Sequence, residues 1–292
     1  MHIEVLIVNA FIDGATGGNP AGVVVNANAL TEAQKQKVAQ QVGLSETAFV
    51  SASDVATIKL EFFTPARQIA HCGHATIATF SLLRQLGMVG EGRLSKETID
   101  GNRDILVDGE MTFMEQRAPK YTQVAAASEL GGRVVASLGP TRARLLSGAD
   151  PFVVNTGNAF LMVPLHDERS VAELRPHLGL VESLSDELNL IGYYVFSTTT
   201  KVKGRHAGAR MFAPRFGIPE ETGTGMAAGP LACFLHDHLG VKDREILIEQ
   251  GWLMQPPSPS VIKVVLELAD GKISRLMAGG AARATSSLQV EA

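Results

Sequence analysis

The chain has 292 residues, of which 45% are hydrophobic and 19% are charged, and its formal net charge is −4. This balance is typical of a globular protein, and the length is sufficient for two domains with their own cores. Acidic and basic residues are interspersed, so no basic stripe indicates a nucleic-acid partner, and no apolar run approaches the ~18 residues that cross a membrane.

The first residues, MHIEVLIVNAF, have the pattern of a buried strand and lack the basic segment and cleavage site of a signal peptide. The 2 cysteines form no disulfide framework. We therefore expect a cytoplasmic protein with neither a membrane nor a nucleic acid as partner.

Strands alternate with two helices in the first half. One helix is predicted to begin at the N-cap Thr31 and to end at Gly43, and the second runs through HATIATFSLLRQLG and ends at Gly87. Between them, TIKLEFF alternates apolar and polar residues with the period of two that indicates a strand. Strands are predicted over residues 3–11, 21–25, 46–53 and 57–63, and an Asp-Gly hairpin over 103–116.

The second half repeats features of the first. NTGNAF resembles GGNPAG, and the motif FAP answers FTP, each followed by a glycine (Gly73 or Gly223) and a helix of small residues. The offset, about half the chain, is too long for a solenoid period of ~20–50 residues. It predicts two similar lobes. Because the composition turns to Ala, Gly and Ser over 125–140, we predict lobes over 1–122 and 123–292, with the last strand able to pack back on the first lobe.

Each predicted lobe offers a proline-ended strand, a loop and a glycine-rich helix start. The unpaired N–H groups and the positive dipole end of a helix start favour an anion. Two such starts that faced each other in a cleft between the lobes would suit the carboxylate of a small substrate.

The helix start around Cys-Gly-His carries three candidate side chains. His71, Cys72 and His74 lack the spacing of common zinc sites, as do Cys233, His236 and His238, so we expect no metal. Cys72 is either a nucleophile or, as we favour, a small buried residue beside the helix start. His74 is either a neutral proton donor or acceptor, or a capping or core residue.

Glu46 is the carboxylate that stands out, since it enters the apolar strand ETAFV after the helix-ending Gly43. Burial of a carboxylate raises its pKa toward the range useful for proton transfer. The alternative is an exposed glutamate at a strand end. Glu220 and Glu221 are predicted either to lie in the first turn of a helix or to face the cleft.

Five motifs occur in the order found in the PhzF-like phenazine-biosynthesis proteins: NPAGVV, LSETAFV, FFTP with CGHATIA, NTGNAFLMVPL, and RMFAP followed by GIPEETGTGMAAGPLACFL. The chain resembles this family nearly throughout, to about Gly280, and its last 12 residues look like an unmatched tail. The resemblance implies an α+β fold like that of diaminopimelate epimerase, with two pseudo-symmetric lobes that each wrap a mixed sheet around a central helix. It also implies a cofactor-free isomerase that moves a proton on a small carboxylic acid, and a homodimer.

Matched by position, the resemblance implies that Glu46, His74 and Glu221 are catalytic. It implies that the substrate-binding residues are Asn19, Gly73, Gly223, Thr224, Gly225 and Met226. Two positions depart from the family pattern, which usually has aspartate at Glu221 and serine at Met226. These departures argue against the phenazine substrate itself.

Racemases of the same fold use two cysteines, and the matching positions here are Cys72 and Thr222. Because the second is no thiol, we expect carboxylate chemistry rather than two-thiol racemisation. Two alternatives stay open: a binding protein that holds a small carboxylate without turnover, and a racemase or dehydratase of hydroxy or imino acids.

Overall fold

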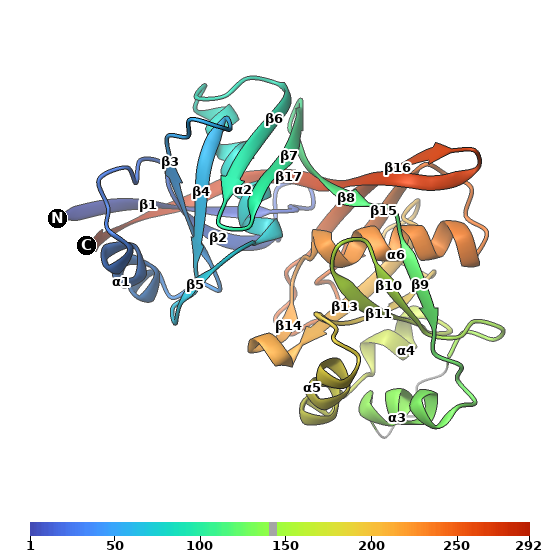
Figure 1. Ribbon diagram of the computed structural model, residues 1–292. Helices are drawn as coiled ribbons and strands as arrows, with labels where there is room; N and C mark the ends of the chain where they lie inside the picture. Colours follow the sequence, from blue (N-terminus) through green and yellow to red (C-terminus); the bar gives the residue numbers. More distant parts are fainter. Residues whose placement is uncertain (140–144) are drawn as a thin grey trace. The chain divides into compact units, whose positions relative to one another are not determined.

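The structure is a computed structural model that describes residues 1–139 and 145–292 (Figure 1). The chain forms two compact units. The first unit comprises Met1–Glu115 and Gly279–Ala292, and the second comprises Gln116–Ala278. Both units are mixed α+β and dominated by sheet. The stretch 125–140, whose composition suggested the boundary between lobes, ends outside the described residues. Most of its described part forms a helix within the second unit.

Two helices and a ring of strands make up the first unit. Its elements are β1 (His2–Ala10), β2 (Asn19–Val24), α1 (Glu32–Val42), β3 (Thr47–Ser51), β4 (Ile58–Phe63), β5 (Gln68–Ile69), α2 (Gly73–Gln85), β6 (Gly92–Thr98), β7 (Gly101–Asp108), β8 (Met111–Arg117) and the last part of β17 (Lys272–Glu291).

Hydrogen bonds link the strands of this unit in the order β17-β1-β2-β3-β4-β6-β7-β8. Strand β8 also pairs with β17, so the succession closes on itself. Helix α2 packs on β1, β2 and β3, and every residue from Gly73 to Leu83 is buried. A mixed sheet therefore surrounds one buried helix.

Local signals in the sequence placed both helices of the first unit. Thr31 caps α1 in a capping box with Gln34, and Gly43 ends the helix with φ 68°. Gly87 follows the end of α2 with φ 69°. The predicted helix boundaries are confirmed because each rests on a residue whose backbone preference is local.

The last residues form no separate tail but a strand that packs back on the first unit, as the sequence analysis allowed. Residues 279–291 belong to β17, which pairs antiparallel with β1 from His2↔Glu291 to Ala10↔Ala282.

The second unit has the same kinds of elements. They are β9 (Lys120–Gln123), α3 (Glu129–Ser137), β10 (Phe152–Asn155), β11 (Ala159–Pro164), α4 (Glu168–Ala172), α5 (Leu178–Glu187), β12 (Gly192–Ser197), β13 (Ala207–Ala213), η1 (Pro214–Phe216), β14 (Ile218–Glu221), α6 (Gly225–His238), β15 (Glu245–Gln250), β16 (Ser260–Ala269) and the start of β17.

The pairings of the second unit follow the succession seen in the first. From β10 to β16 they run antiparallel, parallel, antiparallel, parallel, antiparallel, as they do from β1 to β7. In the first unit the short strand β5 pairs with β4 just before the buried helix α2. In the second unit β14 pairs with β13 just before the buried helix α6. This common topology is what the echo between the two halves of the sequence predicts, while pseudo-symmetry in space stays a prediction.

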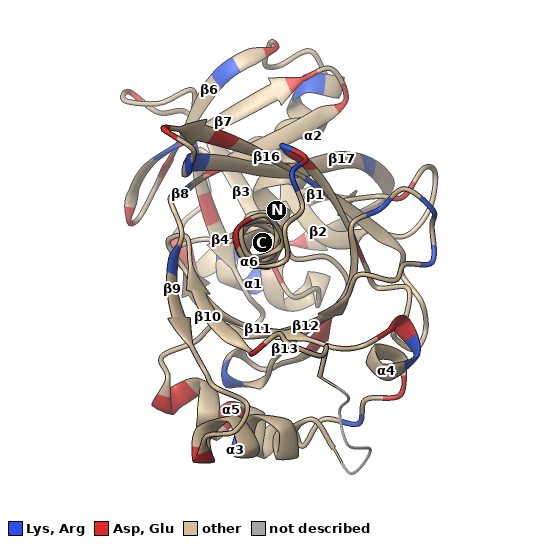
Figure 2. Cartoon of the chain, turned by 90° about the vertical axis from the view of Figure 1, so that its right-hand side faces the viewer, with Lys and Arg blue, Asp and Glu red and all other residues tan. Residues whose placement is uncertain are grey.

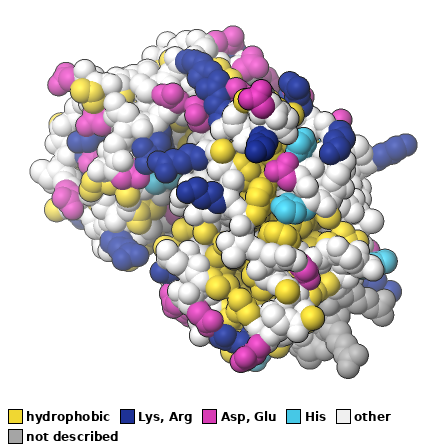
Figure 3. All heavy atoms as spheres, turned by 45° about the vertical axis from the view of Figure 1, so that its right-hand side comes forward, with side chains coloured by type: hydrophobic (Ala, Val, Ile, Leu, Met, Phe, Trp, Pro, Cys, Tyr) yellow, Lys and Arg dark blue, Asp and Glu magenta, His cyan; other side chains and the backbone are white. Residues whose placement is uncertain are grey.

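Charges are mixed over the molecule. Figure 2 shows acidic and basic residues distributed over many elements, and the face in Figure 3 carries both signs without one continuous basic band. Within the described part of the chain, the structure contains no helix with the length and hydropathy of a membrane span.

Adjacent glycines in α3 allow a matched test of packing. A Cβ at Gly131 would lie 2.2 Å from Ala125 O, whereas a Cβ at Gly132 would meet nothing within 4 Å. We expect Gly131→Ala to destabilise the protein by about 1–3 kcal/mol through overpacking. Gly132→Ala should stabilise it by about 0.5–1 kcal/mol, since alanine is the better helix former. Urea denaturation followed by circular dichroism measures both, and equal effects of the two variants would contradict the described position of α3.

Candidate active site

Glu46 lies between the end of α1 and the start of β3. Its backbone carbonyl accepts a hydrogen bond from Gly22 N on β2 (3.1 Å), and the residue is 8% exposed. A Cβ at Gly22 would lie 2.9 Å from Thr47 Oγ1, so the close approach of β2 and β3 requires glycine there. The neighbouring strand thus fixes the backbone of a buried carboxylate, which excludes the alternative of an exposed glutamate at a strand end.

His74 is the second residue of α2 and is 5% exposed. Its Nε2 lies 3.3 Å from Glu46 Oε2. The structure therefore brings together the two residues that the sequence singled out in the first unit, across 28 residues of chain. The imidazole sits in the first turn of a helix, where the dipole disfavours its charged form.

Cys72 completes this cluster. It is the N-cap residue of α2, is 5% exposed and makes no capping hydrogen bond through its side chain. Instead its Sγ lies 3.6 Å from His74 Nδ1. Cys72 is buried, as expected, but its contact with His74 was not predicted from the sequence.

Burial determines the protonation of the Cys72 thiol in this cluster. Burial raises the pKa of the Cys72 thiol, and the nearby Glu46 carboxylate raises it further. The thiol therefore keeps its proton, and its Sγ lies 3.6 Å from His74 Nδ1 while His74 Nε2 faces Glu46. In this arrangement the imidazole of His74 lies between the carboxylate of Glu46 and the thiol of Cys72.

The same three residues could offer one ligand atom each to a metal, since these atoms lie within 4.8 Å of one another. Metal binding requires the thiolate. The raised pKa of Cys72 opposes that form, and the thiol is already hydrogen-bonded to His74. The donor set therefore fits a proton-transfer cluster better than a metal centre.

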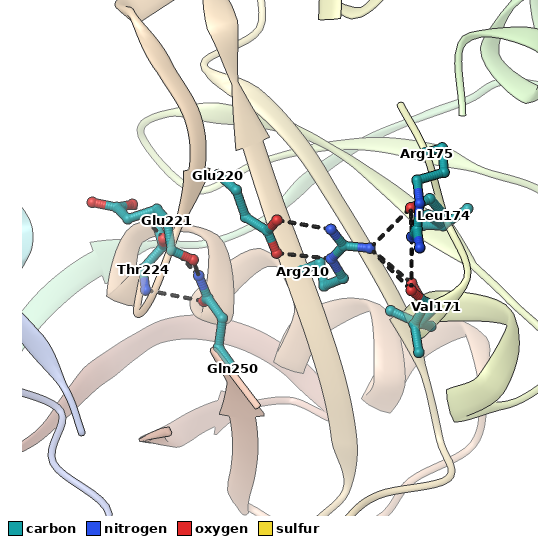
Figure 4. A network of polar contacts seen from close by, with 9 residues as sticks. Val171, Leu174, Arg175, Arg210, Glu220, Glu221, Thr224 and Gln250 are labelled. Atoms are coloured by element: carbon teal, nitrogen blue, oxygen red, sulfur yellow. Dashed lines mark hydrogen bonds and ion pairs between the residues drawn. The ribbon is translucent and has the colours of Figure 1, made fainter. Parts of the chain in front are cut away.

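A second polar network surrounds the start of α6 in the second unit (Figure 4). Thr224, the N-cap residue, donates a hydrogen bond through its hydroxyl to Glu221 Oε2. Gln250 on β15 accepts from Thr224 N (3.0 Å) and donates to Glu221 O (2.7 Å). Tyr194 also donates to Gln250, over 2.8 Å. These contacts hold Glu221 and Thr224 together, as predicted, through a glutamine and a tyrosine that the sequence did not reveal.

The adjacent glutamates on β14 point to different partners in Figure 4. Glu220 pairs with Arg210 through two bonds of 2.7 Å, and Arg210 also donates to the carbonyl groups of Val171 and Leu174. Neither glutamate lies in the first turn of α6, so that alternative is wrong. Side chains alternate along a strand, so Glu220 contacts Arg210 whereas Glu221 contacts Thr224 at the start of α6.

The remaining predicted residues lie at or near the two helix starts. In the first unit Gly73 is the first residue of α2, and Asn19 is a buried residue at the start of β2. In the second unit Gly225 is the first residue of α6, two positions later than a match of Gly223 with Gly73 implies. Met226 accepts a hydrogen bond at Sδ from Asn158 (3.4 Å), so the departure from serine leaves a weak acceptor there.

Comparison with known proteins identifies the class. The family model described as phenazine biosynthesis-like protein matches residues 8–287. The chain belongs to this family, and the match continues through most of the segment expected to be a tail. A relative in Escherichia coli O157:H7 named "Uncharacterized isomerase YddE" is 29% identical over 97% of this chain and 96% of its own.

A relative with a named reaction is the trans-2,3-dihydro-3-hydroxyanthranilate isomerase of Pseudomonas aeruginosa, which is 28% identical over 88% of both chains. A solved structure of a PhzF-family protein from Bacillus anthracis has a TM-score of 0.88 at 27% identity, with full coverage of both chains. The family and these relatives make the chain an isomerase by class.

The fold extends to a wider group. A hydroxyproline epimerase of Agrobacterium vitis has a TM-score of 0.57 at 14% identity, covering 99% of this chain and 92% of its own. At that identity the likeness concerns the fold alone.

The proximity of Glu46 to Cys72 predicts the reactivity of the thiol. We expect Cys72 to react with iodoacetamide at pH 8 far more slowly than an unburied thiol, because its pKa is raised and it is 5% exposed. Glu46→Gln should raise that rate several-fold by removing the charge that opposes the thiolate. Cys233, which is fully buried in α6, is the internal control and should not respond. Peptide mass spectrometry separates the two sites, and an unchanged rate at Cys72 would contradict the coupling.

Proposed function

We propose that the chain is a cofactor-independent isomerase that moves a proton on a small carboxylic acid, with Glu46 as the base. The observation that carries the proposal is the buried contact between Glu46 and His74 at the start of α2. A carboxylate that is shielded from water and faced by an imidazole is suited to remove a proton from an acidified C–H group. It would return that proton to another carbon of the same molecule.

The start of α2 supplies the electrostatic part of this mechanism. Gly73 N–H has no acceptor within the described ranges, as is normal for the first turn of a helix. A substrate carboxylate at that position would meet the N–H group and the positive end of the helix dipole. His74, whose Nε2 faces Glu46, would stabilise the carboxylate form of the base.

Glu221 and Thr224 are proposed to orient the polar groups of the substrate. This role rests on their match to the family pattern and on the hydrogen bond between them. The departures at Glu221 and Met226 favour a substrate other than that of the Pseudomonas relative. A homodimer, a cytoplasmic location and a site shared by the two halves of the chain remain predictions from the sequence.

Deuterium incorporation tests the assignment of Glu46. Purified protein is incubated in D₂O with a metabolite extract, and mass spectrometry identifies carboxylic acids that gain deuterium only in its presence. We expect Glu46→Gln to abolish the labelling with the fold intact. Glu91→Gln is the matched control, since that glutamate is exposed and paired with Arg84, and it should label normally.

Labelling that survives Glu46→Gln would overturn the role of Glu46. If the unmodified protein bound a small acid without labelling it, the non-catalytic binding protein would replace the isomerase. Inversion at a single carbon, sensitive to Cys72→Ser, would instead support a racemase.

The neighbouring glutamates of β14 give a second test. We expect Glu221→Gln to lower the rate of deuterium exchange at least about tenfold, which corresponds to ~1.4 kcal/mol, with little change in thermal stability. Glu220→Gln should instead leave the exchange rate nearly unchanged and lower the stability by about 3 kcal/mol. The reason is that it leaves Arg210, which is 8% exposed, without its carboxylate partner. Exchange assays and thermal melts of both variants, made in parallel, would reject the assignment if the two effects were reversed.

A further inference from the structure

Lys96 is a buried lysine in the first unit that the proposed mechanism does not use. It lies on β6 and is 0% exposed. Within the described residues no carboxylate lies at ion-pair distance from its Nζ, in contrast to Lys35, which pairs with Glu61. An amine in such a place needs other partners, because a buried charge without them is costly.

Three acceptors surround Nζ. It donates to Thr76 Oγ1 over 2.6 Å, lies 3.1 Å from His71 Nδ1, and stands 4.9 Å from the centre of the Phe62 ring. An ammonium group has three N–H donors, so each acceptor can receive one. Thr76 and His71 both act as acceptors toward Lys96. Thr76 uses its own proton to donate to Cys72 O (2.6 Å), and His71 is neutral because burial, together with Lys96, lowers its pKa to about 3.

The charge of Lys96 changes near neutral pH. Burial lowers its pKa from 10.5 to about 7. The charged or titratable groups that act on it are His71 and Cys72 beside α2, and Asp100 and Arg103 at the β6–β7 turn. Asp100 and Arg103 pair with each other over 3.1 Å, so their opposing effects on Lys96 partly cancel.

The hydroxyl of Thr76 connects this lysine to the candidate active site. Thr76 lies in the first turn of α2, and the carbonyl that its hydroxyl contacts belongs to Cys72, whose thiol contacts His74. We propose that Lys96 is a positioning residue for the Glu46–Cys72–His74 cluster and acts, in its ammonium form, through the Thr76 hydroxyl on the backbone of Cys72.

Loss of the proton would weaken the connection in two ways. A neutral amine has two N–H groups for three acceptors, and its remaining bonds lose the strengthening that charge gives. The Thr76 hydroxyl would then be less polarised toward Cys72 O, since hydrogen bonds in a chain reinforce one another. The positive charge that favours an anion at the helix start would disappear at the same time.

The consequence for turnover rests on the proposed function, whereas the link from Lys96 to Cys72 can be measured without any substrate. The chain has only 2 cysteines, so [1-¹³C]cysteine labels the carbonyls of Cys72 and Cys233 alone. Cys233 lies on α6 in the second unit and is an internal reference.

We expect the Cys72 carbonyl signal to shift in one step with a midpoint near 7, together with the [ε-¹³C] signal of Lys96, while the Cys233 signal stays constant. Both signals are read in the unmodified protein, so the test does not depend on the folding of a variant. A Lys96 midpoint near its ordinary value of 10.5, or a Cys72 signal without a matching step, would overturn the proposal.

Three variants separate positioning from simple structural support. Lys96→Met should remove the step at Cys72. Thr76→Val should remove it as well while Lys96 still titrates, because only the connecting hydroxyl is lost. Lys35→Met, which changes another buried lysine of the same unit, should leave the step unchanged. A step at Cys72 that persists in Thr76→Val would reject the hydroxyl as the link.

Turnover provides the functional readout. With an acid identified by deuterium labelling, we expect kcat/KM to fall several-fold as the pH rises through 7, and this fall to be absent in Lys96→Met. A carbonyl step without any exchangeable acid would leave the positioning link in place and reject the isomerase. Glu46-dependent exchange without a carbonyl step would reject the link and retain the isomerase.

Discussion

A helix that is buried along most of its length is the constraint on which the first unit depends. Residues Gly73 to Leu83 of α2 are all buried, so their polar side chains must find partners inside the protein. Thr76 and Thr79 donate to carbonyls one turn earlier, and Ser81 bonds Thr112 on β8. The start of the helix differs, because its first N–H groups have no hydrogen-bond partners within the helix. The candidate active site is built there.

The same burial acts on three ionisable groups near that helix start. It raises the pKa of the Cys72 thiol and lowers the pKa of Lys96 and His71, so each group is pushed toward its neutral form. Burial therefore decides which of these groups beside the helix start hold a proton. This is the physical connection between the packing of the fold and the acid/base chemistry that we propose for it.

Much of the local structure was predictable. Thr31, Gly43 and Gly87 bound the two helices of the first unit, and the alternation in TIKLEFF gives β4. The motif around Glu46 and the Cys-Gly-His step pointed to the residues that the structure brings within 3.3 Å. Two features were not predicted from the sequence: the separate partners of Glu220 and Glu221, and the inward position of Lys96.

The sequence by itself determined what can be read within a few residues: helix caps, strand periods, glycines at turns, and the family motifs that name Glu46 and His74. Tertiary structure alone decided which polar groups meet. The contacts from Glu46 to His74, from Lys96 to Thr76 and from Gln250 to Thr224 join residues about 20 to 30 positions apart. Such contacts depend on how strands register around a buried helix, and register follows from the packing of the whole sheet rather than from any local preference.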